Sequence, residues 1–103
     1  MSRPLPFDDH QVPLYTVGQV AQMLDVQPAF LRRLDSEQVL QPARSDGGQR
    51  RYSRDQVALV GRISDLIEEG LTLSGIRQVI MLQDQVAHLQ AELAAERARN
   101  KRA

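Results

Sequence analysis

The sequence predicts a mainly α-helical fold, and three observations support this prediction. Two short amphipathic segments lie about three residues apart, which is typical of a helix-turn-helix. The turn Asp46-Gly47-Gly48 between two short segments predicts a two-stranded hairpin. An apolar heptad stripe near the C-terminus predicts a coiled coil. Together they describe a winged helix-turn-helix with a two-stranded wing hairpin, followed by a C-terminal dimerisation coiled-coil helix.

Length and composition limit what kind of protein this is. A chain of 103 residues allows one small domain and an appendage, and two Tyr and two Phe leave the core aliphatic. The absence of cysteine excludes disulfides and thiolate metal sites, and His10 and His88 have no partner at ligand spacing. No apolar run approaches the roughly 20 residues of a membrane span. We therefore expect no cofactor, no metal, no membrane contact and a cytoplasmic protein.

The sequence pattern divides the chain into four parts. Residues 1–13 contain three prolines without apolar periodicity, which predicts a flexible N-terminal arm. Residues 14–81 hold the periodic segments of the winged helix-turn-helix, and residues 82–97 continue as the coiled-coil dimerisation helix. Residues 98–103 carry three basic residues and are expected to form a frayed basic tail.

The helix-turn-helix is predicted from start signals and apolar spacing. Thr16 followed three residues later by Gln19 is a capping box, which predicts a helix over 17–24. Pro28 suits the first turn of a second helix over about 28–36, because its missing N–H is not needed there. This second helix should bury Leu31 and Leu34. Its outward residues are then Gln27, Ala29, Phe30, Arg32 and Arg33.

The hairpin and two further helices follow along the chain. The hairpin strands are expected at Val39-Leu40 and at Arg50-Arg51-Tyr52. Ser53 and Gln56 repeat the capping box, so a third helix should start near Arg54, and Gly70 should end it in a left-handed conformation. Thr72 or Ser74 is expected to cap a fourth helix.

The fourth helix carries a leucine-rich stripe that needs a partner. Its apolar residues alternate at spacings of three and four, which is a heptad pattern, and they are Val79, Leu82, Val86, Leu89 and Leu93. Each large apolar side chain left in water forgoes around 1.5–3 kcal/mol. A second copy of the chain is the simplest partner, which predicts a homodimer. The alternative is that the helix folds back onto its own domain.

Charge is segregated along the chain. The formal net charge is zero, yet residues 28–54 contain six arginines and three acids. A compact basic patch on a neutral protein suits sequence-specific binding of double-stranded DNA, because the salt-dependent phosphate attraction stays modest and base contacts matter more.

These residues resemble the DNA-binding half of a MerR-family transcriptional regulator. The resemblance covers about Tyr15 to Ile80 and is most similar to the heat-shock repressor (HspR) subgroup. It rests on four ordered motifs: Tyr15-Thr16-Val17-Gly18-Gln19-Val20-Ala21, Val26 to Asp35 with Leu31-Arg32-Arg33, Gly48-Gln49-Arg50-Arg51-Tyr52, and Gly70-Leu71-Thr72-Leu73-Ser74-Gly75-Ile76. Two departures concern the second helix, where Phe30 stands at the family's Thr and Arg33-Leu34 replaces a Tyr-Tyr pair.

The resemblance implies a nucleoid-associated transcription regulator that binds an inverted repeat as a homodimer. On the second helix, Arg32 is expected to read a guanine, with Gln27, Ala29 and Phe30 near other bases and Arg33 at a phosphate. In the wing, the expected DNA contacts are Arg44, Arg50, Arg51 and Tyr52, with Tyr52 donating to a phosphate, and Thr16 joins this DNA-binding set. The sequence ends soon after the stripe, which implies one of two things. Either the protein has no effector domain of its own and is controlled by a regulatory protein partner, by its abundance or by temperature, or the sequence is part of a longer chain.

Two other functions are compatible with the same fold. The protein could be an adaptor that binds a sigma factor or another regulator through the Leu82–Leu93 stripe, or an excisionase-like architectural DNA-binding protein. An enzyme is not expected, because no paired carboxylates, nucleophile–base set or phosphate-binding loop occurs.

Overall fold

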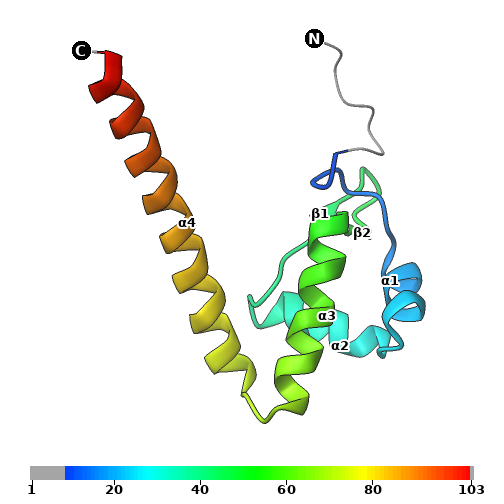
Figure 1. Ribbon diagram of the computed structural model, residues 1–103. Coiled ribbons are helices and arrows are strands. Elements are labelled where there is room, and N and C mark those ends of the chain that lie inside the picture. Colours follow the sequence, from blue (N-terminus) through cyan, green and yellow to red (C-terminus); the bar gives the residue numbers. More distant parts are fainter. Residues whose placement is uncertain (1–8, 103) are drawn as a thin grey trace.

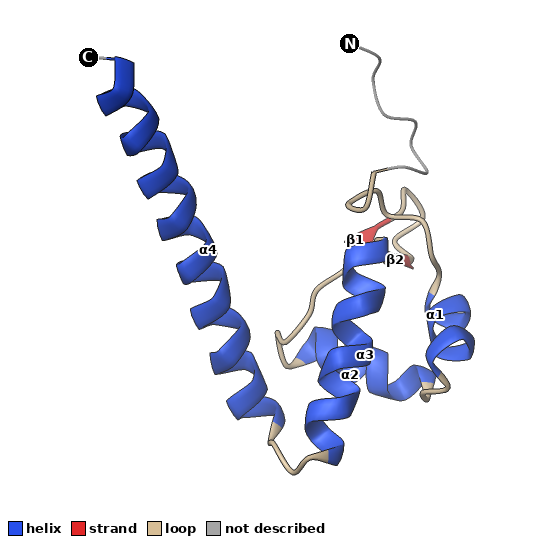
Figure 2. Cartoon of the chain, in the orientation of Figure 1, coloured by secondary structure: helices blue, strands red, loops and turns tan. Residues whose placement is uncertain are grey.

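The computed structural model describes residues 9–102, which form four helices and one two-stranded sheet (Figures 1 and 2). The elements in chain order are α1 (Val17–Leu24), α2 (Pro28–Ser36), β1 (Ala43–Arg44), β2 (Arg50–Arg51), α3 (Arg54–Glu68) and α4 (Leu73–Arg102). The fold class and the order of elements expected from the sequence are confirmed.

The helix starts follow from the capping residues. Thr16 Oγ1 accepts from Gln19 N at 3.1 Å, and Gln19 Oε1 accepts from Thr16 N at 2.9 Å, which completes the capping box of α1. Ser53 and Gln56 form the equivalent pair at α3, with distances of 3.1 and 3.0 Å. Both capping boxes predicted from the sequence are confirmed.

A single left-handed residue sets the turn between α1 and α2. Asp25 caps α1 at φ 53°, and its N–H donates to Ala21 O. Asp tolerates this conformation better than most residues other than glycine. Pro28 then begins α2, whose N-terminal flank Gln27 provides no side-chain cap. The turn brings α2 against α1 and leaves one face of α2 at the surface.

The first wing strand lies further along the chain than predicted. Val39 and Leu40 are not a strand, because their N–H groups both donate to Leu34 O, at 2.8 and 3.2 Å, and so wrap around the end of α2. Both side chains are buried in the core. Gln38, at φ 59°, turns the chain into this path. The strand β1 begins only at Ala43, after the buried Pro42.

The wing hairpin is short and closes through Gly48. Ala43 pairs with Arg51 and Arg44 with Arg50 in antiparallel register. Gly48 N donates to Ser45 O at 2.9 Å, and Gly48 has φ 81°. An i to i+3 hydrogen bond followed by a left-handed glycine is typical of three-residue hairpin loops. Tyr52 lies just beyond β2.

Tyr52 joins the wing to the start of α1. Its backbone forms an isolated antiparallel bridge with Tyr15, with Tyr52 N to Tyr15 O at 2.7 Å and Tyr15 N to Tyr52 O at 2.9 Å. Its side chain is 1% exposed and lies in the core. The other side chains with the least exposure come from every helix: Val20, Leu31, Leu34, Val60, Ile63 and Ile76.

The residues just before the domain are held against it. His10 O accepts from Asp55 N at 3.1 Å, and His10 Nδ1 lies 3.5 Å from Asp55 Oδ1. Leu14 N also donates to Tyr52 O at 3.0 Å. Within the arm predicted for residues 1–13, these contacts hold His10 against α3, and residues 1–8 lie outside the described residues.

Helix α4 leaves the domain after two turns. Leu73 and Ile76 are buried, whereas every residue from Met81 to Arg102 is exposed. Figure 1 shows this part projecting away from the other helices. The helix does not fold back onto its own domain. Residues 98–102 are helical rather than frayed, and Arg99 pairs with Glu96 one turn earlier.

Candidate nucleic-acid interface

The exposed face of α2 carries two arginines, Arg32 and Arg33. Leu31 and Leu34 are buried, so the intervening Arg32 and Arg33 point to the surface, with Gln27 and Ala29 also exposed. Phe30 is only half-buried and packs against the core. Gln27, Ala29, Arg32 and Arg33 are therefore outward as the sequence predicted, whereas Phe30 is only partly so.

Arg33 already has an anionic partner, whereas Arg32 has none in the described range. Arg33 Nε lies 2.5 Å from Glu37 Oε2, one turn along α2, and both side chains are largely exposed. Arg32 makes no hydrogen bond or ion pair with any of residues 9–102. The guanidinium of Arg32 is therefore available to a ligand, whereas Arg33 must first break its ion pair with Glu37.

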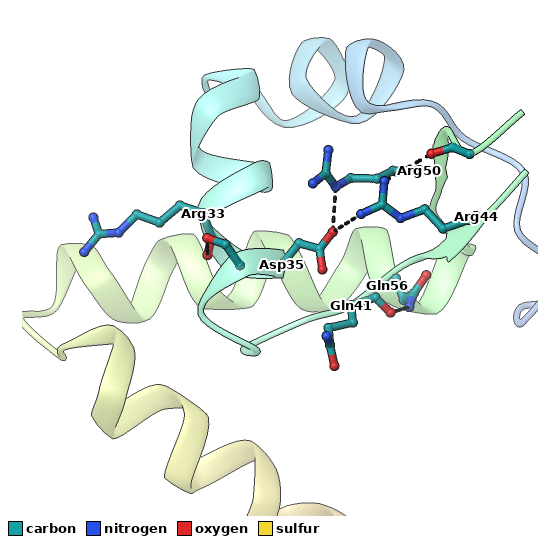
Figure 3. Close-up of polar contacts among 8 residues, drawn as sticks. Arg33, Asp35, Gln41, Arg44, Arg50 and Gln56 are labelled. Atoms are coloured by element: carbon teal, nitrogen blue, oxygen red, sulfur yellow. Dashed lines mark hydrogen bonds and ion pairs between the residues drawn. The ribbon is translucent and has the colours of Figure 1, made fainter.

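Asp35 joins α2 to the wing through two arginines (Figure 3). Asp35 Oδ2 accepts from Arg50 Nε at 2.6 Å and from Arg44 Nη2 at 3.1 Å. The Asp35 side chain is only 12% exposed, so these contacts are partly shielded from water. Arg44 Nη1 also donates to Gly48 O at 3.1 Å, inside the hairpin. One carboxylate thus fixes two cations and leaves a net positive charge.

The chain before β1 is also anchored. Gln56 Nε2, in the first turn of α3, donates to Gln41 O at 3.3 Å (Figure 3). Together with the Asp35 contacts, this bond holds the wing at a defined place beside α2 and α3.

A concave, basic groove lies between the start of α1 and the wing. Its volume is about 350 Å³, and it is lined by Thr16, Val17, Gly18, Arg44, Gly48, Gln49, Arg50 and Arg51. The N-terminus of a helix carries a partial positive charge, so α1 adds to the field of the three arginines. The groove is suited to an anion such as a phosphate of a nucleic-acid backbone.

The guanidinium groups of the wing arginines differ in how exposed they are and in whether they already have a partner. Arg50 has a side chain 22% exposed and is bound to Asp35, whereas Arg44 is half-exposed. Arg51 is half-buried, and its Nη1 atom is buried without a hydrogen-bond partner among the described residues. An unpaired buried donor of this kind is costly unless a ligand reaches it.

The phosphate contact predicted for Tyr52 is wrong. The side chain is 1% exposed, and its hydroxyl is buried without a partner among the described residues. Burial raises the pKa of the Tyr52 hydroxyl, and the positive charge of Arg50 opposes this shift. Tyr52 is a core residue that supports the wing.

The predicted dimerisation residues lie on α4, away from the basic groove. Val79 is half-buried, whereas Leu82, Val86, Leu89 and Leu93 are 49–61% exposed. The structure leaves the stripe uncovered within one chain.

Asp35 is the site residue that the sequence analysis missed. It was counted only as an acid that opposes the arginines, because its partners are nine and fifteen residues away. An acid two residues after a pair of outward arginines, ahead of a basic hairpin, is a signal for such a contact.

Neither a cluster of metal-binding side chains nor a membrane-spanning helix is found among the described residues. Within residues 9–102, no group of three or more His, Cys, Asp or Glu side chains could hold a metal ion. No helix in this range is both long enough and apolar enough to span a membrane.

The sequence is similar to that of known transcriptional regulators. A family model described as MerR HTH family regulatory protein matches residues 15–82. A protein of Streptomyces coelicolor that carries the name heat shock protein HspR is 37% identical over 83 residues, covering 80% of this chain and 55% of that protein. The transcriptional regulators GlnR of Bacillus anthracis and Bacillus cereus are 27% identical over 77 residues, covering 75% of this chain and 60% of theirs. The chain thus spans little more than half the length of these relatives.

Solved structures share the fold. A MerR-family transcriptional regulator from Bacillus cereus superposes with a TM-score of 0.61 at 24% identity, covering 82% of this chain and 70% of that one. HiNmlR, a MerR-family regulator lacking the sensor domain and solved bound to promoter DNA, gives a TM-score of 0.59 at 18% identity, covering 79% and 74%. At such identities, these matches show that the fold is the same.

Proposed function

Because the chain belongs to the MerR family of HTH regulatory proteins, we propose that it regulates transcription by binding an inverted repeat in duplex DNA as a homodimer. The observation that carries this proposal is the placement of the arginines. Arg32 and Arg33 lie on the exposed face of α2, and Arg44, Arg50 and Arg51 line the adjoining groove. We expect such a protein to work at the nucleoid.

Helix α2 enters the major groove in this proposal. Arg32, free of internal partners, is the residue best suited to a bidentate contact with guanine O6 and N7. Gln27 and Ala29 meet neighbouring base edges, and the exposed edge of Phe30 meets a thymine methyl group. Arg33 breaks its ion pair with Glu37 and binds a phosphate instead. This exchange costs little because an exposed ion pair contributes little free energy.

The groove beside the wing then receives the DNA backbone. A phosphate there would meet the start of α1, capped by Thr16, and the guanidinium groups of Arg44 and Arg51. Backbone contacts of this kind position a protein on the duplex, and the contacts from α2 supply the specificity.

The exposed stripe of α4 supplies the homodimer. Leu82, Val86, Leu89 and Leu93 fit a heptad seam that a second α4 would cover. Two chains joined in this way present two copies of α2, which matches the symmetry of an inverted repeat.

Salt-dependent binding to duplex DNA tests the proposal. Affinity for a promoter-derived duplex pool should fall steeply between about 50 and 200 mM salt, because Lys and Arg contacts release condensed counterions. The triple variant Arg44→Ala/Arg50→Ala/Arg51→Ala should lose most of this dependence. Binding that is absent at low salt would contradict DNA recognition.

A protein–protein adaptor is the second candidate, and the uncovered stripe favours it. An adaptor would bind a regulator through Leu82 to Leu93 and would ignore duplex DNA at every salt concentration. The same titration therefore separates the two functions.

A further inference from the structure

We propose that Glu37 exchanges Arg33 for Arg77 when Arg33 binds a DNA phosphate, which makes Arg77 a positioning residue for DNA binding although it lies on α4. The inference rests on the proposed function, since it assigns Glu37 a new partner in the DNA-bound protein. Three features support it: the place of Glu37 between two arginines, the lack of a partner for Arg77, and the charge of the helix ends around Glu37.

Glu37 lies between an arginine of α2 and an arginine of α4. It caps the C-terminus of α2, where its Oε2 atom lies 2.5 Å from Nε of Arg33, one turn earlier. It also lines a small pocket of about 130 Å³ together with Leu73, Ser74 and Arg77 from the start of α4. The Glu37 side chain is 46% exposed, so its carboxylate can turn from Arg33 to the pocket without disturbing the core.

Arg77 has no partner among the residues that the structure describes. It makes no hydrogen bond or ion pair with any of residues 9–102, and its Nε atom is buried. No acid lies three or four residues from Arg77 along α4, where a helical ion pair would form. Of the four residues that line the pocket, Glu37 is the acid. A half-buried guanidinium without a partner is costly, and Glu37 is the carboxylate placed to reduce that cost.

The ends of α2 and α4 favour the same movement of Glu37. The C-terminus of a helix carries a partial negative charge, so a carboxylate at the end of α2 is unfavourable once Arg33 has left it. The N-terminus of α4 carries a partial positive charge, and its first turn contains no acid. Thr72 Oγ1 accepts from Gly75 N at 3.0 Å and satisfies one N–H group of this turn. A carboxylate beside Arg77 is therefore stabilised by the guanidinium and by the helix end together.

DNA binding triggers the exchange in this proposal. In the free protein Arg33 holds Glu37, and a phosphate that binds Arg33 removes this partner. Glu37 then pairs with Arg77, and the new ion pair offsets part of the cost of breaking the first. The new pair connects the end of α2 to the start of α4. It thereby connects the helix that contacts DNA to the helix that carries the apolar stripe.

Loss of Arg33 in the absence of DNA tests the exchange directly. Arg33→Ala frees Glu37 in the same way as a phosphate bound to Arg33. The NMR signal of the Arg77 Nε–H group, identified by its loss in Arg77→Lys, should therefore shift in Arg33→Ala relative to the wild type. It should return to its wild-type position in Arg33→Ala/Glu37→Gln, because a neutral amide forms no ion pair. A signal that stays in place in Arg33→Ala, or that shifts equally in the double variant, would overturn the exchange.

Duplex affinity tests the role of Arg77 in DNA binding. Arg77→Met should weaken the affinity by roughly threefold, because Glu37 then gains no new partner and an ion pair of this kind contributes little. The same substitution should leave the affinity of Glu37→Gln unchanged. Arg62→Met, which removes an exposed arginine of α3, is the matched control and should have the same effect in both backgrounds. An equal loss from Arg77→Met in both backgrounds would be a general effect of charge and would overturn the role of Arg77.

The two tests separate this inference from the proposed function. A wild-type protein that binds no duplex at low salt contradicts the proposed function, while the Arg33→Ala spectra still decide whether Glu37 moves to Arg77. Duplex binding with an unchanged Arg77 signal, in the complex and in Arg33→Ala, overturns the exchange alone. The spectra also decide the matter if Arg77→Met proves unstable in thermal denaturation, since Arg77 is intact in Arg33→Ala.

Discussion

At the scale of single residues, the arginines of the interface differ in what already binds them. Arg44 and Arg50 share Asp35, Arg33 is paired with Glu37, and Arg32 has no ion pair within residues 9–102. These states imply different roles, because a fixed guanidinium shapes the wing and a free one can bind a ligand.

The difference between Arg32 and Arg33 should be visible in base-pair preference. Arg32→Ala is expected to cost roughly 1–3 kcal/mol of operator affinity and to relax the preference at one base pair. Arg33→Ala should weaken all duplexes alike. Glu37→Gln, which releases Arg33, should instead tighten binding to every duplex by up to about fivefold. Competitive anisotropy titrations against duplexes with single base-pair changes measure all three, and unchanged discrimination in Arg32→Ala would refute its assignment.

Tyr52 should behave as a core residue rather than a DNA contact. Tyr52→Phe removes a buried hydroxyl that has no partner among residues 9–102, so stability should be unchanged or slightly higher. Tyr52→Ala should cost roughly 3–5 kcal/mol in urea denaturation. Duplex affinity of Tyr52→Phe should equal that of the wild type. A loss of affinity at unchanged stability would restore the phosphate contact.

At the scale of elements, local signals in the sequence predicted the helices but not every strand. Capping boxes and Pro28 gave the starts of α1, α2 and α3 because they act through neighbouring backbone groups. Val39-Leu40 has strand-like composition, yet its N–H groups bond to the end of α2. The Asp35 contacts and the burial of Tyr52 depend on tertiary packing, which local sequence does not encode.

Substitutions in the two capping boxes should separate effects on stability from effects on duplex binding. Ser53→Ala and Thr16→Ala should each lower stability by about 1 kcal/mol through loss of a helix cap. Only Thr16 lines the basic groove, so only Thr16→Ala should also weaken duplex binding. Denaturation and duplex titration of both variants check this, and equal effects of the two on affinity would argue against a role of the groove.

At the scale of the whole molecule, the chain is more extended than a compact domain of its length. Its radius of gyration is 16.7 Å, against about 13 Å for a compact chain of this length. The excess comes from α4, whose apolar stripe is uncovered (Figure 1). A second copy would cover it and set two α2 helices at a fixed separation.

Disrupting the stripe should abolish the dimer without unfolding the domain. Leu89 is 61% exposed in one chain, so Leu89→Asp should leave the thermal stability of the domain unchanged while producing a monomer in sedimentation. Affinity for a two-half-site duplex should fall to that for one half-site. Ala91→Asp, on the opposite face of α4, is the matched control and should remain dimeric. A dimeric Leu89→Asp would place the interface elsewhere.

The central claim is that two copies of α2, joined by α4, read two related half-sites. Selection of bound sequences from a pool of random duplexes by the purified protein tests it most directly. The account predicts enrichment of an inverted repeat with one fixed spacing and a guanine preference in each half-site that Arg32→Ala removes. Enrichment of an unpaired half-site, or of no sequence at all, would contradict it.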